Sequence, residues 1–268
     1  PSTDPVAFCT YIAFFPSLLA GPIDRARTFI PQLEKKRQFE YSHAAEGMRQ
    51  ILWGLFKKVV IADNCATVTD TIFGQHAGTG SSFVLGAFLY IIQVYADFSG
   101  YSDMAIGFAR LLGFNIVKNF NFPFFAQNIA EFWQRWHISL TTWMTEYVYT
   151  PLSFVFRKLR KTGIILAIII NFILVGLWHG ANWTFVLFGL LQGCYFIPMI
   201  LRGTLNTKNN VIIPKFLPGG REFINMAGTF TLMMLTSLLF RASNLKEAFG
   251  YYKSILSSSL FSAPRFMG

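Results

Sequence analysis

The chain has 268 residues, of which 53% are hydrophobic and only 13% are charged, and its formal net charge is +10. Soluble domains carry about 25% charged residues, so this composition excludes an ordinary soluble domain and indicates a protein whose surface is solvated by lipid. The basic residues fall in short clusters between apolar segments, as they do in cytoplasmic loops of membrane proteins, so the positive charge does not indicate nucleic-acid binding.

The apolar segments predict a series of membrane-spanning helices, since each span needs about 17–25 mostly apolar residues. In chain order, the expected spans are residues 6–21, 81–98, 163–178, 183–201 and 223–240. The fold class that follows is an all-α, polytopic integral membrane protein that is embedded in a lipid bilayer.

The segments between these spans are less regular. Residues 44–62 read as an amphipathic helix, and its basic residues favour an interfacial or tilted position. The helix that begins at residue 81 is expected to break at Gly100 and Gly107, because glycine weakens a helix interior. Residues 127–150 are aromatic, polar and compatible with a helix, whereas the tail after Lys246 is ambiguous.

Basic clusters predict an orientation for the hairpin formed by the spans 163–178 and 183–201. The clusters at 157–161 and 202–221 lie at its two ends, so both ends should be cytoplasmic and the tip should face the other side. His179 lies about 24 Å along the first helix, and we therefore expect it in the outer half of the membrane.

A histidine in an apolar segment is the most informative feature of the chain. His179 stands in FILVGLWHGANWTF, and Asn182 and Trp183 follow it at spacings of three and four residues, which would place all three on one helical face. An ionisable group at membrane depth is costly unless it has a function or a partner. A neutral histidine is a suitable general base near neutral pH. A structural histidine that hydrogen-bonds across helices is the alternative.

A second cluster lies in the segment EFWQRWHISL. It mixes charged and aromatic side chains, namely Glu131, Trp133, Arg135, Trp136 and His137. These residues could line a tunnel or pocket in the membrane. Glu131 and Arg135 could equally pair with each other, since they have the favourable spacing of four residues.

Two carboxylates, Asp97 and Asp103, lie in or beside the span that begins at residue 81. Paired carboxylates could carry out acid–base chemistry. Anchoring of Arg110 or Arg135 is the favoured alternative, because buried carboxylates in membrane proteins usually have a partner.

Five blocks resemble one known family when they are taken together. They are FFPSLLAGPIDRARTFIPQL, YADFSGYSDMAIGFARLLGF, NFNFPFFAQNIAEFWQRWHISLTTWMTEYVYTPL, GLWHGANWTFVLFGLLQG and FRASN, in that order. The chain resembles the membrane-bound O-acyltransferase family over residues 8–245, and the blocks WHISLTTW and FRASN resemble its alginate-type branch more than its D-alanyl branch. The resemblance implies one domain over residues 1–268, with transmembrane and re-entrant helices around a central tunnel. It also implies that N-terminal helices and the extreme C-terminus of the family are missing from this chain.

The same resemblance implies an activity and a site. His179 is the expected catalytic histidine, and His137 is the expected second one. The residues expected to line the tunnel or contact the substrate are Trp133, Arg135, Trp136, Trp178, Asn182, Asp97 and Asp103. We expect no metal and no tightly bound cofactor; the co-substrate is an acyl thioester, either acetyl-CoA or an acyl-carrier protein. The acceptor is a hydroxyl of an extracytoplasmic polysaccharide, reached directly or through an acetyltransferase partner protein, and the expected location is the bacterial cytoplasmic (inner) membrane.

Three other functions stay open at this point. The first is D-alanyl transfer to teichoic acid. The second is a transporter or channel in which His179 belongs to a proton relay, and the third is a membrane scaffold without catalysis.

Overall fold

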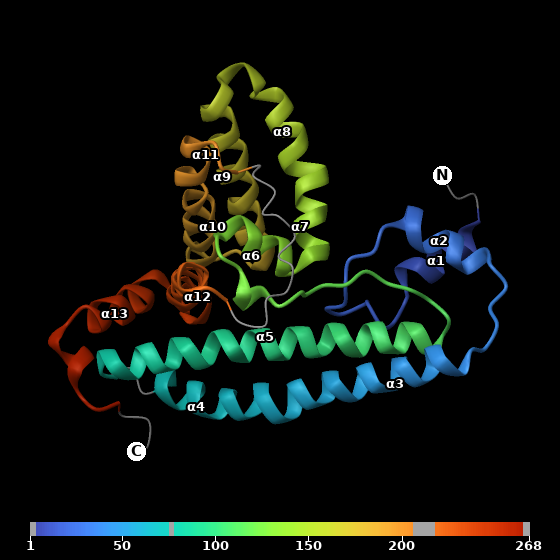
Figure 1. Ribbon diagram of the computed structural model, residues 1–268, viewed down its shortest axis with the longest axis horizontal. Coiled ribbons are helices and arrows are strands. Elements are labelled where there is room, and N and C mark those ends of the chain that lie inside the picture. The colour runs from blue at the N-terminus through green and yellow to red at the C-terminus, as the bar shows by residue number, and fades with distance from the viewer. Residues whose placement is uncertain (1–3, 75–77, 206–217, 265–268) are drawn as a thin grey trace. The chain divides into compact units, whose positions relative to one another are not determined.

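A computed structural model describes residues 4–74, 78–205 and 218–264, and these residues form helices and connecting loops without any strand (Figure 1). Four helical segments are long and apolar enough to cross a membrane. They are α5 (Gly80–Leu111), α9 (Arg160–His179) with the turn before it, α10 (Trp183–Tyr195) with α11 (Ile197–Arg202), and α12 (Gly220–Arg241). Four of the five expected spans are therefore confirmed, and the chain is an all-helical, polytopic membrane protein.

The expected span at residues 6–21 is wrong. Helix α1 (Pro5–Ile12) ends early, and the chain continues through turns as far as Gly21. Pro16 explains the difference, because proline has no N–H to donate and disfavours helical geometry in the residue before it. This segment is too short, as a helix, to cross the hydrocarbon core.

The chain forms two compact units. The first contains residues 1–67, 92–121 and 136–140, and the second contains residues 68–91, 122–135 and 141–268. The boundary at residue 92 falls inside α5, which thus supplies helix to both units. The expectation of one domain over residues 1–268 stays a prediction.

Aromatic packing forms the core at the N-terminal end of the first unit. Phe14 follows α1, Phe29 lies in α2 (Ala26–Glu34), and Phe114 follows α5. Their ring centroids are 4.6–5.3 Å apart, and all three side chains are buried. Ring contacts of this kind add to the free energy gained by burial, so these three segments are held together.

A long helix, drawn in blue in Figure 1, runs beside the part of α5 that belongs to the first unit. It begins with α3 (Tyr41–Leu55), widens into a π-helical turn, η1 (Phe56–Ala62), and continues as α4 (Asp63–Gly74). The predicted amphipathic helix at 44–62 is thus part of a longer one. Gly100 and Gly107 do not break α5; they are the positions at which its backbone approaches that of α3.

An antiparallel hairpin of α9 and α10 dominates the second unit. A Cβ atom at Gly176 would lie 2.1 Å from the carbonyl oxygen of Phe185, and one at Gly189 would lie 2.2 Å from that of Phe172. Only glycine permits such close contact, which is how helices associate within lipid. Helix α12 packs on α10, and the ambiguous tail forms α13 (Leu245–Ile255) and the short turn η5 (Ser258–Phe261). Most of the basic stretch 202–221 lies outside the described residues.

The aromatic segment at 127–150 is a chain of short helices. After the turn η2 (Pro123–Phe125) come α6 (Ile129–Arg135), α7 (Ile138–Met144), the π-helical η3 (Thr145–Tyr149) and α8 (Thr150–Val155). The helix is interrupted at Trp136 and His137, and this interruption places His137 in a non-helical backbone conformation.

Candidate functional site

His179 is the last residue of α9 and is half-buried among aromatic rings of the second unit. Its ring centroid lies 4.7 Å from that of Phe240 and 4.8 Å from that of Trp178, with Phe185 farther away at 6.3 Å. No hydrogen bond to its ring nitrogens occurs among the described residues. The imidazole therefore does not join helices through hydrogen bonds, and both of its nitrogens can serve a substrate.

The turn after His179 differs from the prediction. Gly180 ends α9, and Asn182 is the N-cap of α10, so His179, Asn182 and Trp183 do not share one helical face. The Asn182 side chain accepts a hydrogen bond from the Thr184 N–H and donates one to the Ser243 carbonyl, at 3.1 and 2.8 Å. Asn182 thereby ties the turn to the FRASN block, a role that the local spacing did not reveal.

The two tryptophans of the WHGANW block lie at the surface of the second unit. Trp178 is 55% exposed and Trp183 is 72% exposed. In a membrane protein such side chains face lipid, headgroups or a substrate, and tryptophan is favoured at the boundary between lipid and water.

His137 lies in the first unit in a left-handed backbone conformation, with φ of 44°. This conformation is uncommon for residues other than glycine, although histidine adopts it more often than most. The side chain is buried, its Nδ1 lies 3.0 Å from Oδ1 of Asn119, and its ring meets that of Phe98 edge to face at 4.7 Å. The neighbouring Trp136 packs on Phe120 at 5.2 Å.

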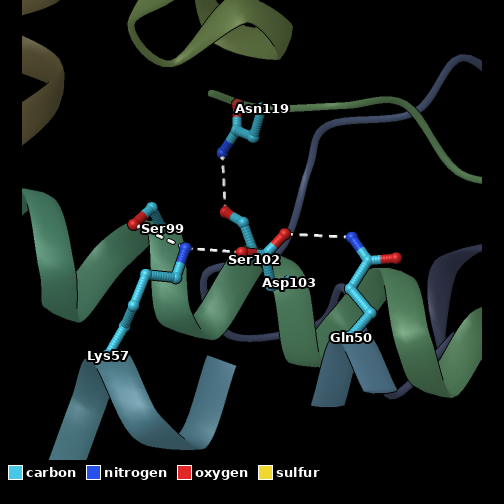
Figure 2. A network of polar contacts seen from close by, with 6 residues as sticks. All are labelled: Gln50, Lys57, Ser99, Ser102, Asp103 and Asn119. Carbon is cyan, nitrogen blue, oxygen red and sulfur yellow. Dashed lines mark hydrogen bonds and ion pairs between the residues drawn. The ribbon is translucent and has the colours of Figure 1, made fainter. Parts of the chain in front are cut away.

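Asn119 is the centre of a buried polar cluster around His137, and sequence reasoning missed it. Its Nδ2 donates to the Ser102 hydroxyl at 3.1 Å, as Figure 2 shows. Its Oδ1 accepts from the Ser139 hydroxyl at 2.9 Å and from the Ser139 N–H at 3.3 Å. An asparagine within the aromatic stretch NFNFPF was the only sequence signal for this cluster.

Asp103 belongs to a network that joins α3 and η1 to α5 (Figure 2). The carboxylate pairs with the buried Lys57 ammonium and accepts a hydrogen bond from the Gln50 amide at 2.9 Å. Lys57 also donates to the Ser99 hydroxyl at 2.9 Å. The favoured interpretation as a structural anchor fits these contacts, but the expected partners, Arg110 and Arg135, were wrong.

Asp97 has a similar arrangement at a more exposed position. Its carboxylate lies 2.7 Å from Lys58, which also pairs with Asp63 at 2.8 Å. The hydrogen bond to Asp63 has the largest effect on the pKa of the Lys58 ammonium, and the one to Asp97 the next largest; both raise this pKa above its usual value. Arg110, the other expected partner, lies 3.7 Å from Glu46 instead.

Trp133 and Arg135 are held by partners within the second unit. The buried Trp133 indole N–H donates to Gln192 at 3.1 Å, and its ring packs on Phe172. Arg135 pairs with Glu131 at 2.7 Å, which is the pairing that their spacing of four residues had left open beside a tunnel-lining role.

The predicted site residues thus fall into two sets. Asp97, Asp103, Trp136 and His137 belong to the first unit, and Trp133, Arg135, Trp178, His179 and Asn182 belong to the second. Within the first unit, Ser102 contacts Asn119 and is the chain neighbour of Asp103, so the His137 cluster and the Lys57–Asp103 network meet on α5. No group of three or more acidic, histidine or cysteine side chains suited to a metal ion occurs in the part of the chain that the structure describes.

Comparison with known proteins identifies clear relatives. A sequence profile of MBOAT, the membrane-bound O-acyltransferase family, matches residues 2–238. The chain is 38% identical over 257 residues to a probable alginate O-acetylase of Azotobacter vinelandii, which covers 94% of this chain and 48% of the relative. It is 36% identical over 254 residues to a peptidoglycan O-acetyltransferase of Helicobacter pylori, with 93% and 46% covered.

A more distant similarity extends to a different acyl group. The chain is 34% identical over 202 residues to a teichoic acid D-alanyltransferase of Bacillus subtilis, which covers 69% of this chain and 50% of the relative. The chain spans about half the length of the curated relatives that it matches.

Proposed function

The chain belongs to the membrane-bound O-acyltransferase family, and from that premise we propose that its protein transfers an acetyl group to a hydroxyl of an extracytoplasmic polysaccharide. The relatives with the higher identities are named for O-acetylation of alginate and of peptidoglycan, and this supports acetyl over D-alanyl as the acyl group. The proposed donor is a cytosolic thioester, either acetyl-CoA or an acyl-carrier protein.

The environment of His179 is the observation on which this proposal depends. Its imidazole lies at the end of a helix long enough to cross a membrane, among aromatic rings, and without a hydrogen-bond partner in the described residues. A histidine kept only for structure would hydrogen-bond to a neighbouring helix, since a polar group in lipid is costly when unpaired. An imidazole left free for a substrate fits catalysis better.

The proposed step is a direct acyl transfer. The alcohol loses its proton to a His179 ring nitrogen while its oxygen attacks the thioester carbonyl carbon. A new C–O bond forms, the C–S bond breaks, and the leaving thiolate takes the proton from the imidazolium, which restores neutral histidine. General-base catalysis of this kind contributes about 100- to 10,000-fold to a rate.

The remaining roles are proposed from charge and position. His137 is proposed as the second catalytic histidine, and Trp133, Arg135 and Trp136 are proposed to line the route of the thioester or to position it. The basic clusters, such as the one at 157–161, would attract the phosphates of coenzyme A or an acidic carrier protein from the cytoplasmic side. We propose the bacterial inner membrane as the location of the protein, with the acceptor glycan or an acetyltransferase partner on the side opposite to these clusters.

Acyl transfer by membranes that contain the full-length protein tests the proposal. Labelled acetyl thioester and D-alanyl thioester are offered separately with a glycan acceptor. His179→Ala should abolish transfer, whereas His43→Ala, which changes an exposed histidine in α3, should leave it unchanged. If His179→Ala leaves the rate of acyl transfer unchanged, the proposed mechanism is wrong. Proton or solute flux without an acylated product would favour the transporter, and use of the D-alanyl donor alone would favour the teichoic acid reaction.

A further inference from the structure

The orientation of the Asn119 side chain can be assigned from the groups around it. The Ser139 backbone N–H can only donate, so the Asn119 atom 3.3 Å from it must be the amide oxygen. The opposite assignment would place an amide NH2 group against that N–H, with no acceptor between them. The Ser102 hydroxyl, 3.1 Å from the other branch, then receives a hydrogen bond from Nδ2. The Ser139 N–H thus decides the orientation, and the Ser102 hydroxyl, which can accept or donate, is compatible with it.

This orientation decides which nitrogen of His137 carries the hydrogen. Oδ1 of Asn119 has no hydrogen to donate, so its 3.0 Å contact with His137 Nδ1 requires an N–H on Nδ1. In neutral histidine the other nitrogen, Nε2, then holds the lone pair. Both side chains are buried, at 0% exposure for Asn119 and 3% for His137, so water does not compete for this hydrogen bond.

Asn119 also holds the backbone that presents His137. Its carbonyl oxygen accepts the Ile138 N–H at 2.9 Å, and its side-chain oxygen accepts the Ser139 N–H, the first two N–H groups of α7. These groups have no partner within their own helix. The two hydrogen bonds hold α7 directly after the left-handed His137, and so they help to offset the strain of that conformation.

We propose that Asn119 is a positioning residue that fixes His137 as the Nδ1–H tautomer, so that Nε2 carries the lone pair. This inference rests on the proposed function only in its consequence for catalysis. In the other tautomer, Nε2 would carry the hydrogen and could donate a hydrogen bond but not accept one, which would change how His137 contacts the thioester on its proposed route.

NMR spectroscopy tests the tautomer without any turnover. The 268 residues contain four histidines; the protein is labelled with 15N at its histidines in lipid nanodiscs, and His137 is assigned by the loss of its signals in His137→Gln. The two-bond couplings between ring nitrogens and ring carbon-bound protons distinguish Nδ1–H from Nε2–H. We expect Nδ1–H in the wild type and in Asn119→Asp, which keeps an oxygen acceptor, and a changed or mixed tautomer in Asn119→Leu. An Nε2–H signal in the wild type, or an unchanged Nδ1–H signal in Asn119→Leu, would overturn the inference.

Kinetics test the consequence in the same variants. Asn119→Leu should lower kcat about 10- to 100-fold with little change in KM, and Asn119→Asp should recover most of this loss. Asn171→Leu is the matched control, because it places the same leucine at another buried asparagine, in α9, whose Oδ1 has no hydrogen-bond partner in the described residues. Equal losses in Asn119→Leu and Asn119→Asp would overturn the positioning role. Full transfer by His137→Ala would instead overturn only the proposed catalytic role of His137. It would leave the tautomer assignment intact, because the NMR measurement does not depend on turnover.

Discussion

Gly54 of α3 and Gly100 of α5 lie against each other so closely that neither could carry a side chain. A Cβ atom at Gly54 would lie 2.5 Å from the Gly100 carbonyl oxygen, and one at Gly100 would lie 2.7 Å from that of Gly54. Gly47 and Gly107 repeat this arrangement along the same pair of helices, at 2.9 and 2.6 Å. The two helices therefore meet along a line of backbone contacts.

Substitution of Gly100 by alanine should force these helices apart. We expect Gly100→Ala to lower the free energy of unfolding by about 1–3 kcal/mol, the usual cost of overpacking. Gly228→Ala in α12 is the control, since a Cβ there meets nothing within 4 Å, and it should be neutral or stabilise the helix by up to about 1 kcal/mol. Thermal unfolding in detergent measures both, and equal stability of the two variants would contradict the close contact.

Removal of Lys57 should destabilise the first unit more than removal of its neighbour Lys58. Lys57→Met leaves the Asp103 carboxylate without its cation, so we expect the free energy of unfolding to fall by about 3 kcal/mol. Lys58→Met should lower the free energy of unfolding by at most about 1 kcal/mol, because the Lys58 side chain is 44% exposed. The measurement is the free energy of unfolding of Lys57→Met, Asp103→Leu, Lys58→Met and the double variant Lys57→Met/Asp103→Leu. The double variant should regain stability; a simple sum of the two single losses would show that the pair is not coupled.

Gly180→Ala should impair transfer through the aromatic surroundings of His179. A Cβ at Gly180 would lie 2.8 Å from the Phe185 ring, which packs on Phe240, and Phe240 in turn contacts His179. We expect transfer to fall about tenfold, because small displacements of a catalytic group are costly. Combining Gly180→Ala with Phe185→Leu gives the added methyl group more room and should restore part of the rate. Full activity of Gly180→Ala would show that the position of Phe185 does not matter for the reaction.

Asp24 should make stability depend on pH. It lies in the loop before α2, and burial raises the pKa of its carboxyl from 3.8 to about 6, against the opposing effect of the Val117 N–H. The folded state thus holds this proton more tightly than the unfolded state. The resulting stabilisation is complete below pH 3.8 and is lost as the pH rises through 6.

Asp24→Asn keeps an acceptor for Val117 and cannot ionise. We therefore expect this variant to unfold at a higher temperature than the wild type at pH 7.5, and the difference to vanish near pH 4. Melting curves of both proteins across this range are the measurement. A difference that stays constant with pH would rule out the raised pKa as its origin.

Much of the fold was predictable because lipid restricts what a spanning segment can be. Four apolar segments of sufficient length became helices long enough to span, as hydropathy alone indicates. The errors arose at a proline and at two glycines, whose effect on their helices was predicted wrongly. Pro16 ends a helix within an apolar stretch, whereas Gly100 and Gly107, which were expected to break α5, permit close packing within it.

The candidate site was predictable in its ionisable residues but not in their partners. His179 and His137 stand out because charged or titratable groups are rare in apolar sequence. Asn119 has no such signal, since its importance arises only when Ser102, Ser139 and His137 meet around it in space. The partner of Asp103 was missed for the same reason: which cation reaches a carboxylate depends on the helix face opposite to it.

The glycine contacts between α9 and α10 also have a consequence for biosynthesis. The two helices are joined by a turn of only three residues, 180–182, so the contacts beside the turn, such as that of Gly176 with Phe185, join residues that are close in sequence. Local contacts form early, because little chain entropy is lost in bringing their partners together. We therefore expect the nascent chain to close this hairpin soon after residue 195 has entered the bilayer. The imidazole at its tip would then have its neighbours Trp178 and Phe185 in place before α12 delivers Phe240.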